Sequence, residues 1–354
     1  MKATFPKLGL PLAAIAMWSG CASAGPPLVP SLRLPTPVSD LRAVRKGDRV
    51  YLSWTDPRET SDHENIRSAG PTLVCRSQAA PIRECGAPVA KIAPPAKIGA
   101  KASYTDTLLP VPGVAPDAQI TYAVEALNDR GRGAGLSNQV RVPLFPAMPP
   151  PADFEAKVTA EGVRFSWECL SSLPAVPGVG YRLRVYRRAE ASSLDEVAAE
   201  VNFADCNGAA VLDTGFEWEK TYDYRAAVIS VISEPGEAKV EIEGDDTPSL
   251  RVFAHDIFPP AVPNGLQAVF SGVGQPPFVD LIWTPDSDAD LAGYNVYRRE
   301  EGGVFARLNP ELVKTSAFRD PAVQTGKKYF YAVSAVDVRG NESAKSAEAS
   351  EEAP

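Results

Sequence analysis

The sequence predicts an all-β fold of three tandem two-sheet β-sandwiches that follow a cleaved signal sequence. One order of landmarks occurs three times along the 354 residues, each time around a tryptophan. These segments alternate apolar and polar residues, as half-buried antiparallel strands do. The chain also has 34 prolines and 26 glycines, and long helices are not expected because proline removes a backbone donor and clashes inside a helix.

Residues 1–21 have the order of a secretory signal with a lipobox-like end. Lys2 and Lys7 supply a positive start, and an apolar run too short to span a bilayer covers Leu8–Met17. Trp18-Ser19-Gly20-Cys21 resembles the bacterial lipoprotein box, in which the cysteine becomes the lipidated first residue. A cut after Ala24 is the alternative, and it would discard Cys21 and release a secreted protein.

The cysteine count fits an exported chain. Without Cys21, one pair remains in each of two segments, which suggests two local disulfides among Cys75, Cys85, Cys169 and Cys206. Four free buried thiols are the alternative. Residues 22–35 are rich in proline and predict a semi-rigid tether ahead of the first sandwich.

The repeated landmarks are strand-like segments in a constant order. The tryptophan strands end at Trp54, Trp167 and Trp283, which are 113 and 116 residues apart. The landmarks that follow are a strand with a basic end (Leu73–Arg76, Arg184–Arg187, Asn295–Arg298), a short strand ending in aspartate (Tyr104–Asp106, Val211–Asp213, Phe318–Asp320) and an aromatic strand (Ile120–Val124, Tyr222–Ala226, Tyr329–Val333). Such turn-bounded strands fit a sandwich better than a barrel or a parallel sheet.

This order resembles tandem fibronectin type III domains, most closely at Asp290–Arg298 and Gly326–Asp337. The resemblance implies immunoglobulin-like (fibronectin type III) β-sandwiches at residues 36–145, 147–256 and 259–352. It implies that Trp54, Trp167 and Trp283 face the cores and that Tyr222 and Tyr329 are corner tyrosines. Ile120 departs from this pattern in the first copy. The family topology also implies that Cys169 and Cys206 lie on neighbouring strands.

One strand of the second copy carries a candidate binding face. Arg182, Arg184, Tyr186 and Arg188 alternate with apolar residues, so their side chains are expected on one outer surface. A basic and aromatic surface can hold an anionic glycan or an acidic partner by charge-assisted bonds and stacking. The alternative is a charged face that keeps the sheet soluble.

No catalytic or metal-binding constellation stands at a recognisable spacing, and no cofactor is expected. His63 and His255 are interpreted as a loop residue and a junction residue. Asp286, Asp288 and Asp290 are spaced as in calcium loops but lack the glycine and distal glutamate of an EF-hand, so calcium binding stays open. The net charge of −8 and the pI near 5.1 argue against nucleic-acid binding.

These observations predict a non-enzymatic, exported, lipid-anchored cell-envelope protein that acts as a monomeric spacer and protein-interaction array. It is expected at the outer membrane or in the periplasm, or secreted if Cys21 is not lipidated. Its expected partners are other envelope or surface proteins, or glycans, and it reaches the membrane through its lipid anchor only. The alternative is a carbohydrate-binding accessory protein, which requires a row of exposed aromatic side chains on one sheet.

Overall fold

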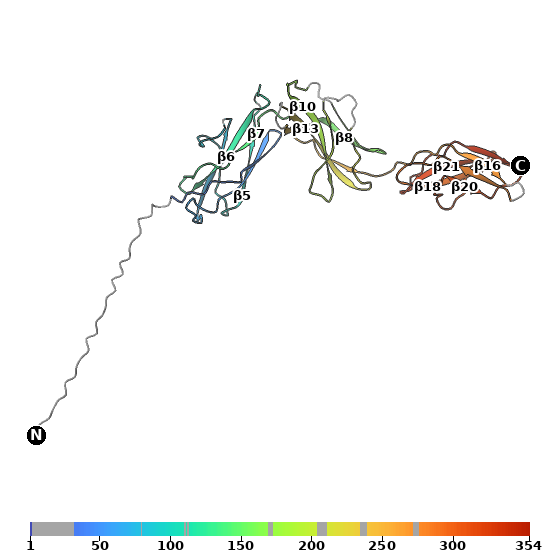
Figure 1. Ribbon diagram of the computed structural model, residues 1–354, viewed down its shortest axis with the longest axis horizontal. Coiled ribbons are helices and arrows are strands. Elements are labelled where there is room, and N and C mark those ends of the chain that lie inside the picture. Colours follow the sequence, from blue (N-terminus) through green and yellow to red (C-terminus); the bar gives the residue numbers. More distant parts are fainter. Residues whose placement is uncertain are drawn as a thin grey trace. The chain divides into compact units, whose positions relative to one another are not determined.

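The computed structural model describes residues 1, 32–78, 80–109, 111, 113–168, 173–203, 211–233, 239–271 and 276–354. Their regular elements are the β-strands β1 to β22 (Figure 1). In this described part, no helix has the length and apolar character needed to cross a membrane. The predicted signal sequence with Cys21, and the proposed pair Cys169 and Cys206, lie outside the described residues.

Sandwich 1 consists of β1 to β7. One sheet has the order β1-β2-β5 and the other the order β4-β3-β6-β7. The strands are β1 (Arg42–Lys46), β2 (Arg49–Thr55), β3 (Ala69–Ser77), β4 (Pro88–Ile92), β5 (Lys101–Thr107), β6 (Gln119–Asn128) and β7 (Val140–Pro143).

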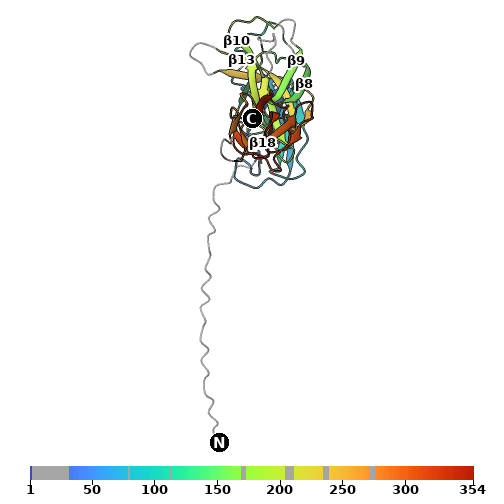
Figure 2. The same cartoon turned by 90° about the vertical axis from the view of Figure 1, so that its right-hand side faces the viewer.

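Sandwich 2 consists of β8 to β15, with sheets of order β12-β9-β8 and β11-β10-β13-β14. β15 also pairs with β13, so the last strand position is filled by two short strands along β13. Figure 2 shows β8 beside β9 and β10 beside β13. The strands are β8 (Ala152–Thr159), β9 (Gly162–Glu168), β10 (Val179–Ala189), β11 (Glu196–Asn202), β12 (Val211–Asp213), β13 (Thr221–Ile232), β14 (Val240–Glu243) and β15 (Leu250–Phe253).

Sandwich 3 consists of β16 to β22, with sheets of order β16-β17-β20 and β19-β18-β21-β22. The strands are β16 (Gln267–Ser271), β17 (Phe278–Ile282), β18 (Leu291–Glu300), β19 (Ala306–Arg307), β20 (Ala317–Asp320), β21 (Lys327–Asp337) and β22 (Ala349–Ala353). The predicted all-β fold of three sandwiches is confirmed.

By residue contacts, the chain forms two compact units. The first comprises residues 1–42, 52–104 and 121–141, and the second comprises residues 43–51, 105–120 and 142–354. Sandwiches 2 and 3 therefore belong to one unit, and contacts between them are contacts within it. The boundaries 36–145, 147–256 and 259–352 stay predictions.

Each core is built around the repeated tryptophan strand. Trp54 is buried, and its Nε1 donates a hydrogen bond of 3.0 Å to Asp56 Oδ1. Trp283 is also buried and meets the Tyr294 ring edge-on, with 5.1 Å between ring centroids. Trp167 is half-buried and packs against the core of sandwich 2, where Phe165 and Tyr224 are fully buried. Of the three tryptophans, Trp167 lies closest to the surface.

Two hydroxyl contacts identify corner tyrosines. Tyr222 Oη accepts a hydrogen bond from the backbone N–H of Glu217 at 2.9 Å, and Tyr329 Oη accepts one from Gln324 at 3.0 Å. Such a bond ties the start of an aromatic strand to the loop before it. Ile120 is buried at the corresponding place in sandwich 1 and has no hydroxyl, as its sequence indicates.

Sandwiches 2 and 3 each bury an aspartate between an arginine and a tyrosine. Asp213 accepts hydrogen bonds from Arg187 at 2.9 and 3.0 Å and from Tyr224 at 2.9 Å. In sandwich 3, Asp320 accepts bonds from Arg298 at 2.8 Å and Tyr331 at 3.0 Å. Burial, followed by the neighbouring aspartate, raises the pKa of both tyrosines, so each hydroxyl remains a proton donor.

Cys75 and Cys85 form a disulfide, with 5.4 Å between their Cα atoms. Cys75 lies within β3, two residues before the end of the strand, and belongs to a small apolar cluster with Ile82 and Ala123. A bridge of this kind is typical of exported proteins.

We expect reduction of this disulfide to lower the free energy of unfolding by about 2–3 kcal/mol, because the bridge closes a short loop in the unfolded chain. Thermal unfolding of a Cys75→Ser/Cys85→Ser variant, compared with the unaltered chain, measures the loss. An unchanged melting temperature would contradict the assignment of a stabilising bridge.

Candidate functional site

The structure places Arg182, Arg184, Tyr186 and Arg188 along one face of β10, as the sequence predicts. Carboxylates of the neighbouring strands pair with them. Arg182 and Arg184 contact Glu200 on β11 at 2.8 and 2.6 Å, and Arg184 also contacts Glu241 on β14 at 2.9 Å. An external anion would therefore have to displace these carboxylates, and anion binding at this face stays a prediction.

The paired charges on this face also shift the pKa values of its ionisable side chains. Burial opposes ionisation of Glu200, but hydrogen bonds from Arg184 and Arg182 hold its pKa below the ordinary value. Burial and a hydrogen bond to Glu243 raise the pKa of Tyr186 to about 12. The face thus carries fixed ion pairs at neutral pH.

Lys46, the last residue of β1, contacts the end of β14. Its Nζ lies 2.8 Å from Glu243 and 2.7 Å from Asp246, and the next N–H, of Gly47, donates to the Glu243 carbonyl at 2.8 Å. Gly47 has a φ of +56°, and a Cβ there would lie 2.5 Å from the Asp245 side chain. Glycine adopts this left-handed φ without strain and leaves room for the Asp245 carboxylate. We call these contacts the Lys46 clamp.

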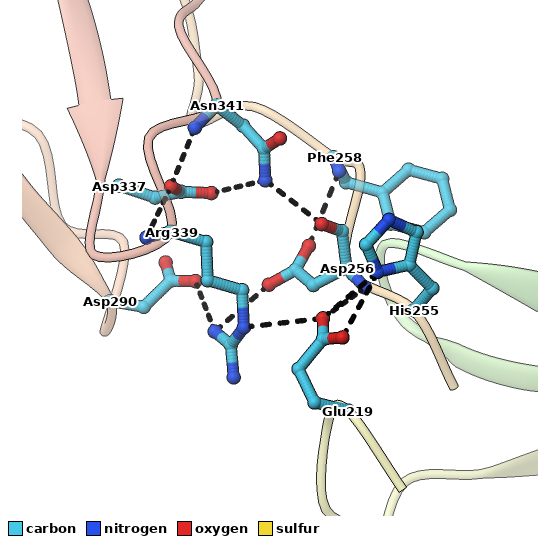
Figure 3. A network of polar contacts seen from close by, with 8 residues as sticks. All are labelled: Glu219, His255, Asp256, Phe258, Asp290, Asp337, Arg339 and Asn341. Carbon is cyan, nitrogen blue, oxygen red and sulfur yellow. Dashed lines mark hydrogen bonds and ion pairs between the residues drawn. The ribbon is translucent and has the colours of Figure 1, made fainter. Parts of the chain in front are cut away.

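A second set of contacts joins sandwich 2 to sandwich 3 (Figure 3). Arg339, in the turn after β21, reaches Asp256 Oδ2 at 3.1 Å and Glu219 Oε1 at 3.7 Å. Asn341 Nδ2, from the same turn, donates to the Asp256 carbonyl at 3.1 Å. The Asp256 side chain is only 3% exposed, so its charge is held against the guanidinium away from water. We call these contacts the Arg339 clamp.

Neighbouring groups hold the clamp residues in position. Asp337 Oδ1 accepts the backbone N–H groups of Arg339 and Asn341, both at 2.8 Å, which fixes the shape of the turn. On the opposite side, Glu219 accepts the Asp256 N–H at 3.0 Å and faces His255 Nδ1. Phe258 packs near the Trp218 ring, so the proline-rich connection is held by apolar contact as well.

The pKa of Glu219 lies below its ordinary value, first because the Asp256 N–H donates to it and then because His255 faces it. A lowered folded-state pKa favours the folded clamp above the unfolded value, near 4.3, and this contribution is lost as the pH falls through the folded value. We therefore expect an NMR titration of the Glu219 carboxylate to show a midpoint below about 4.3. An ordinary midpoint would contradict the contact.

Oxygen atoms of Asp256, Asp290 and Asp337 lie within 4.8 Å of one another. Arg339 Nη1 lies 3.9 Å from Asp290 and 3.1 Å from Asp256, so a protein cation already faces two of the three. Of the predicted calcium loop, only Asp290 belongs to this cluster. Asp286 and Asp288 accept backbone N–H groups from Asp288 and Ala261 instead. Sequence reasoning missed the cluster because its members come from three separate segments.

Exposed aromatic side chains are sparse in the described segments. Tyr51 and Phe253 are the aromatic residues whose side chains are largely exposed there, and they belong to different sandwiches. They form no row on one sheet. His63 has a φ of +61° and lines a polar pocket of sandwich 1, whereas His255 belongs to the Arg339 clamp.

Comparison with known proteins adds sequence relatives for part of the chain. No protein-family model matches it. A Fn3-like protein from Clostridium thermocellum is 35% identical, over 27% of this chain and 96% of that protein, with a TM-score of 0.24. The paired antiparallel sheets of the three sandwiches decide the fold. The chain has the fibronectin type III-like fold. The three FN1–FN3 domains of chicken CNTN1 cover 90% of it at 14% identity and a TM-score of 0.27.

The curated relatives are enzymes that match this fibronectin type III-like chain over short segments. Amylopullulanase from Thermoanaerobacterium saccharolyticum is 36% identical over 126 residues, which are 35% of this chain and 9% of that enzyme. Amylopullulanase from Thermoanaerobacter thermohydrosulfuricus is 42% identical over 84 residues, 23% of this chain and 5% of the enzyme. The chain thus spans less than a tenth of the length of these relatives.

Proposed function

We propose that this protein is an exported, lipid-anchored, non-enzymatic component of the cell envelope, whose sandwiches act as a spacer and present surfaces to partner proteins. The observation that carries the proposal is the Arg339 clamp. A tether without such contacts would leave its domains free to turn on their linkers. Here a buried carboxylate, a guanidinium and a side-chain amide tie sandwich 2 to sandwich 3.

The Lys46 clamp supports the same proposal. Lys46 bridges two carboxylates of sandwich 2, and its Nζ also lies 5.7 Å from the Tyr186 ring. The linker residue Phe145 is buried with Ile232 and Ile242, so the connection after β7 packs into the apolar core at that end. Charged and apolar contacts together hold residues 43–51 and the connection after β7 within the second compact unit.

Distance measurement by double electron–electron resonance tests the spacer role. Nitroxides on noncanonical residues at the exposed positions Glu161 and Glu301 report the separation of sandwiches 2 and 3 without altering native cysteines. We expect a narrow distance distribution that broadens in Arg339→Gln. Arg319→Gln, which removes an exposed pair with Asp280 inside sandwich 3, is the control and should leave the distribution narrow. A broad distribution in the unaltered chain would refute the proposal.

An accessory role beside a carbohydrate-degrading enzyme is a second candidate, favoured by the identity with segments of amylopullulanases. The sparse exposed aromatics of the described residues offer no stacking platform for a sugar chain. In such a role, we expect the protein to hold an enzyme at a distance from its attachment point rather than to bind the carbohydrate substrate. Affinity electrophoresis in a gel that contains pullulan distinguishes an enzyme spacer from a glycan-binding protein, because only direct binding to the glycan slows migration of the protein.

A further inference from the structure

The turn after β6 in sandwich 1 has the same hydrogen bonds as the turn that forms the Arg339 clamp. Asn128 Oδ1 accepts the backbone N–H groups of Arg130 and Arg132 at 2.9 and 3.0 Å, as Asp337 accepts those of Arg339 and Asn341. Both turns also contact the chain segment that enters their sandwich. Asn128 Nδ2 donates to the Leu32 carbonyl at 3.0 Å, and Asn341 Nδ2 donates to the Asp256 carbonyl at 3.1 Å.

Arg130 therefore stands two residues into its turn, as Arg339 does. The difference lies in what the guanidinium meets. Arg339 contacts carboxylates of the preceding sandwich, whereas Arg130 is exposed and makes no side-chain hydrogen bond or ion pair with any other part of the described chain. Arg67 is likewise exposed and unpaired within these segments.

A polar pocket of about 440 Å³ adjoins the turn. Arg67, His63, Asn65 and Asp129 are among the residues that line it. The pocket contains acidic groups of its own, including Glu64, but the Arg339 turn is also flanked by its own Asp290 and Asp337 and still receives two further carboxylates. Local acidic residues therefore do not prevent such a turn from accepting a carboxylate from outside.

The segment that precedes sandwich 1 offers no such group. The sequence has no aspartate or glutamate before Asp40, so residues 1–39 hold no counterpart of Asp256 or Glu219. Asp40 itself accepts the Thr55 N–H at 2.9 Å within its own sandwich. Neither residues 1–39 nor Asp40 therefore supplies Arg130 with a carboxylate.

We propose that the turn at residues 128–133, with Arg130 at its tip and Arg67 beside it, is a docking site for an acidic protein segment that follows a β-strand, as Asp256 follows β15. The chain itself shows that this turn geometry accepts such a segment. The inference rests on the interaction role proposed above and assigns it a partner chemistry. It is independent of the distance measurement between sandwiches 2 and 3, which does not involve Arg130.

The chain's own clamp segment supplies the probe. An end-blocked peptide with the sequence of residues 254–260, Ala-His-Asp-Ile-Phe-Pro-Pro, is titrated into the isotopically labelled full chain while the side-chain Nε–Hε signal of Arg130 is followed by NMR. We expect a saturable shift of that signal. Replacing the aspartate of the peptide by asparagine should weaken binding about fivefold, because a charge-assisted bond at an exposed site is lost.

Two chain variants and one vesicle titration complete the test. Arg130→Gln should weaken peptide binding about fivefold, whereas Arg132→Gln, exposed in the same turn, should leave it unchanged. A silent Arg130 signal, or equal binding of the two peptides, would overturn the proposal. A response to phosphatidylglycerol vesicles without a response to the peptide would overturn it as well and assign the turn to an anionic membrane surface. If the distance distribution is narrow but the Arg130 signal does not shift, the spacer role is supported and only the proposed docking site is refuted.

Discussion

Replacing the buried Asp320 by alanine is expected to lower the free energy of unfolding of sandwich 3 by about 3–5 kcal/mol, because the half-buried Arg298 guanidinium and the buried Tyr331 hydroxyl would lose their shared acceptor. Asp320 is 2% exposed and also accepts the Tyr331 hydroxyl at 3.0 Å and the Ala322 N–H at 3.0 Å. All three donors would be left without this acceptor. Urea unfolding followed by circular dichroism measures the loss.

Asp280→Ala is the matched control for this prediction. Asp280 pairs with Arg319 at 2.7 and 2.9 Å on the strands that neighbour each other in the same sandwich, but both side chains are exposed. Exposed ion pairs contribute at most about 1 kcal/mol. If both substitutions lowered the free energy of unfolding by the same amount, the burial of Asp320 would not explain how strongly its contacts stabilise the sandwich.

Replacing Trp283 by alanine is expected to destabilise sandwich 3 by about 3–5 kcal/mol, because the substitution removes a large apolar side chain and leaves a cavity. Trp283 is 4% exposed and packs against the edge of Tyr294. Calorimetry of the full chain should show the unfolding transition of sandwich 3 at a lower temperature, with the transitions of the other sandwiches unchanged.

Phenylalanine at the same position separates packing from hydrogen bonding. Trp283 Nε1 has no hydrogen-bond partner among the described residues, whereas Trp54 Nε1 donates to the buried Asp56. We therefore expect Trp283→Phe to cost less than Trp54→Phe, because only the second substitution leaves a buried acceptor short of a donor. The reverse order would contradict this account of the two cores.

Much of the strand plan could be predicted from the sequence. Alternation, tryptophan spacing and turn residues located the repeated strands. The disulfide between Cys75 and Cys85 also followed, because two cysteines ten residues apart flank a turn. These features depend on neighbours close in the chain, where periodicity and spacing are informative.

The candidate sites depend on longer separations. Arg339 and Asp256 are 83 residues apart, and Asp256 and Glu219 are 37 apart. Each residue looks like an ordinary turn or linker residue by itself. The basic face of β10 shows the same limit. Its partners Glu200 and Glu241 lie on other strands, and the alternation of apolar and polar residues does not reveal how those strands are aligned with β10.

The sequence by itself determined the class of fold and the recurrence of one unit, because apolar periodicity decides which side of a strand is buried. Tertiary structure decided which charges meet. Asp213 reaches Arg187 and Tyr224 only because sheet pairing sets those two opposite each other on β10 and β13 and brings β12 against them from the other sheet. The same holds for Arg339, which faces a carboxylate, and for Arg130, which faces none in the described chain. Side-chain pairing is a short-range interaction, so it follows from three-dimensional proximity and not from order along the chain.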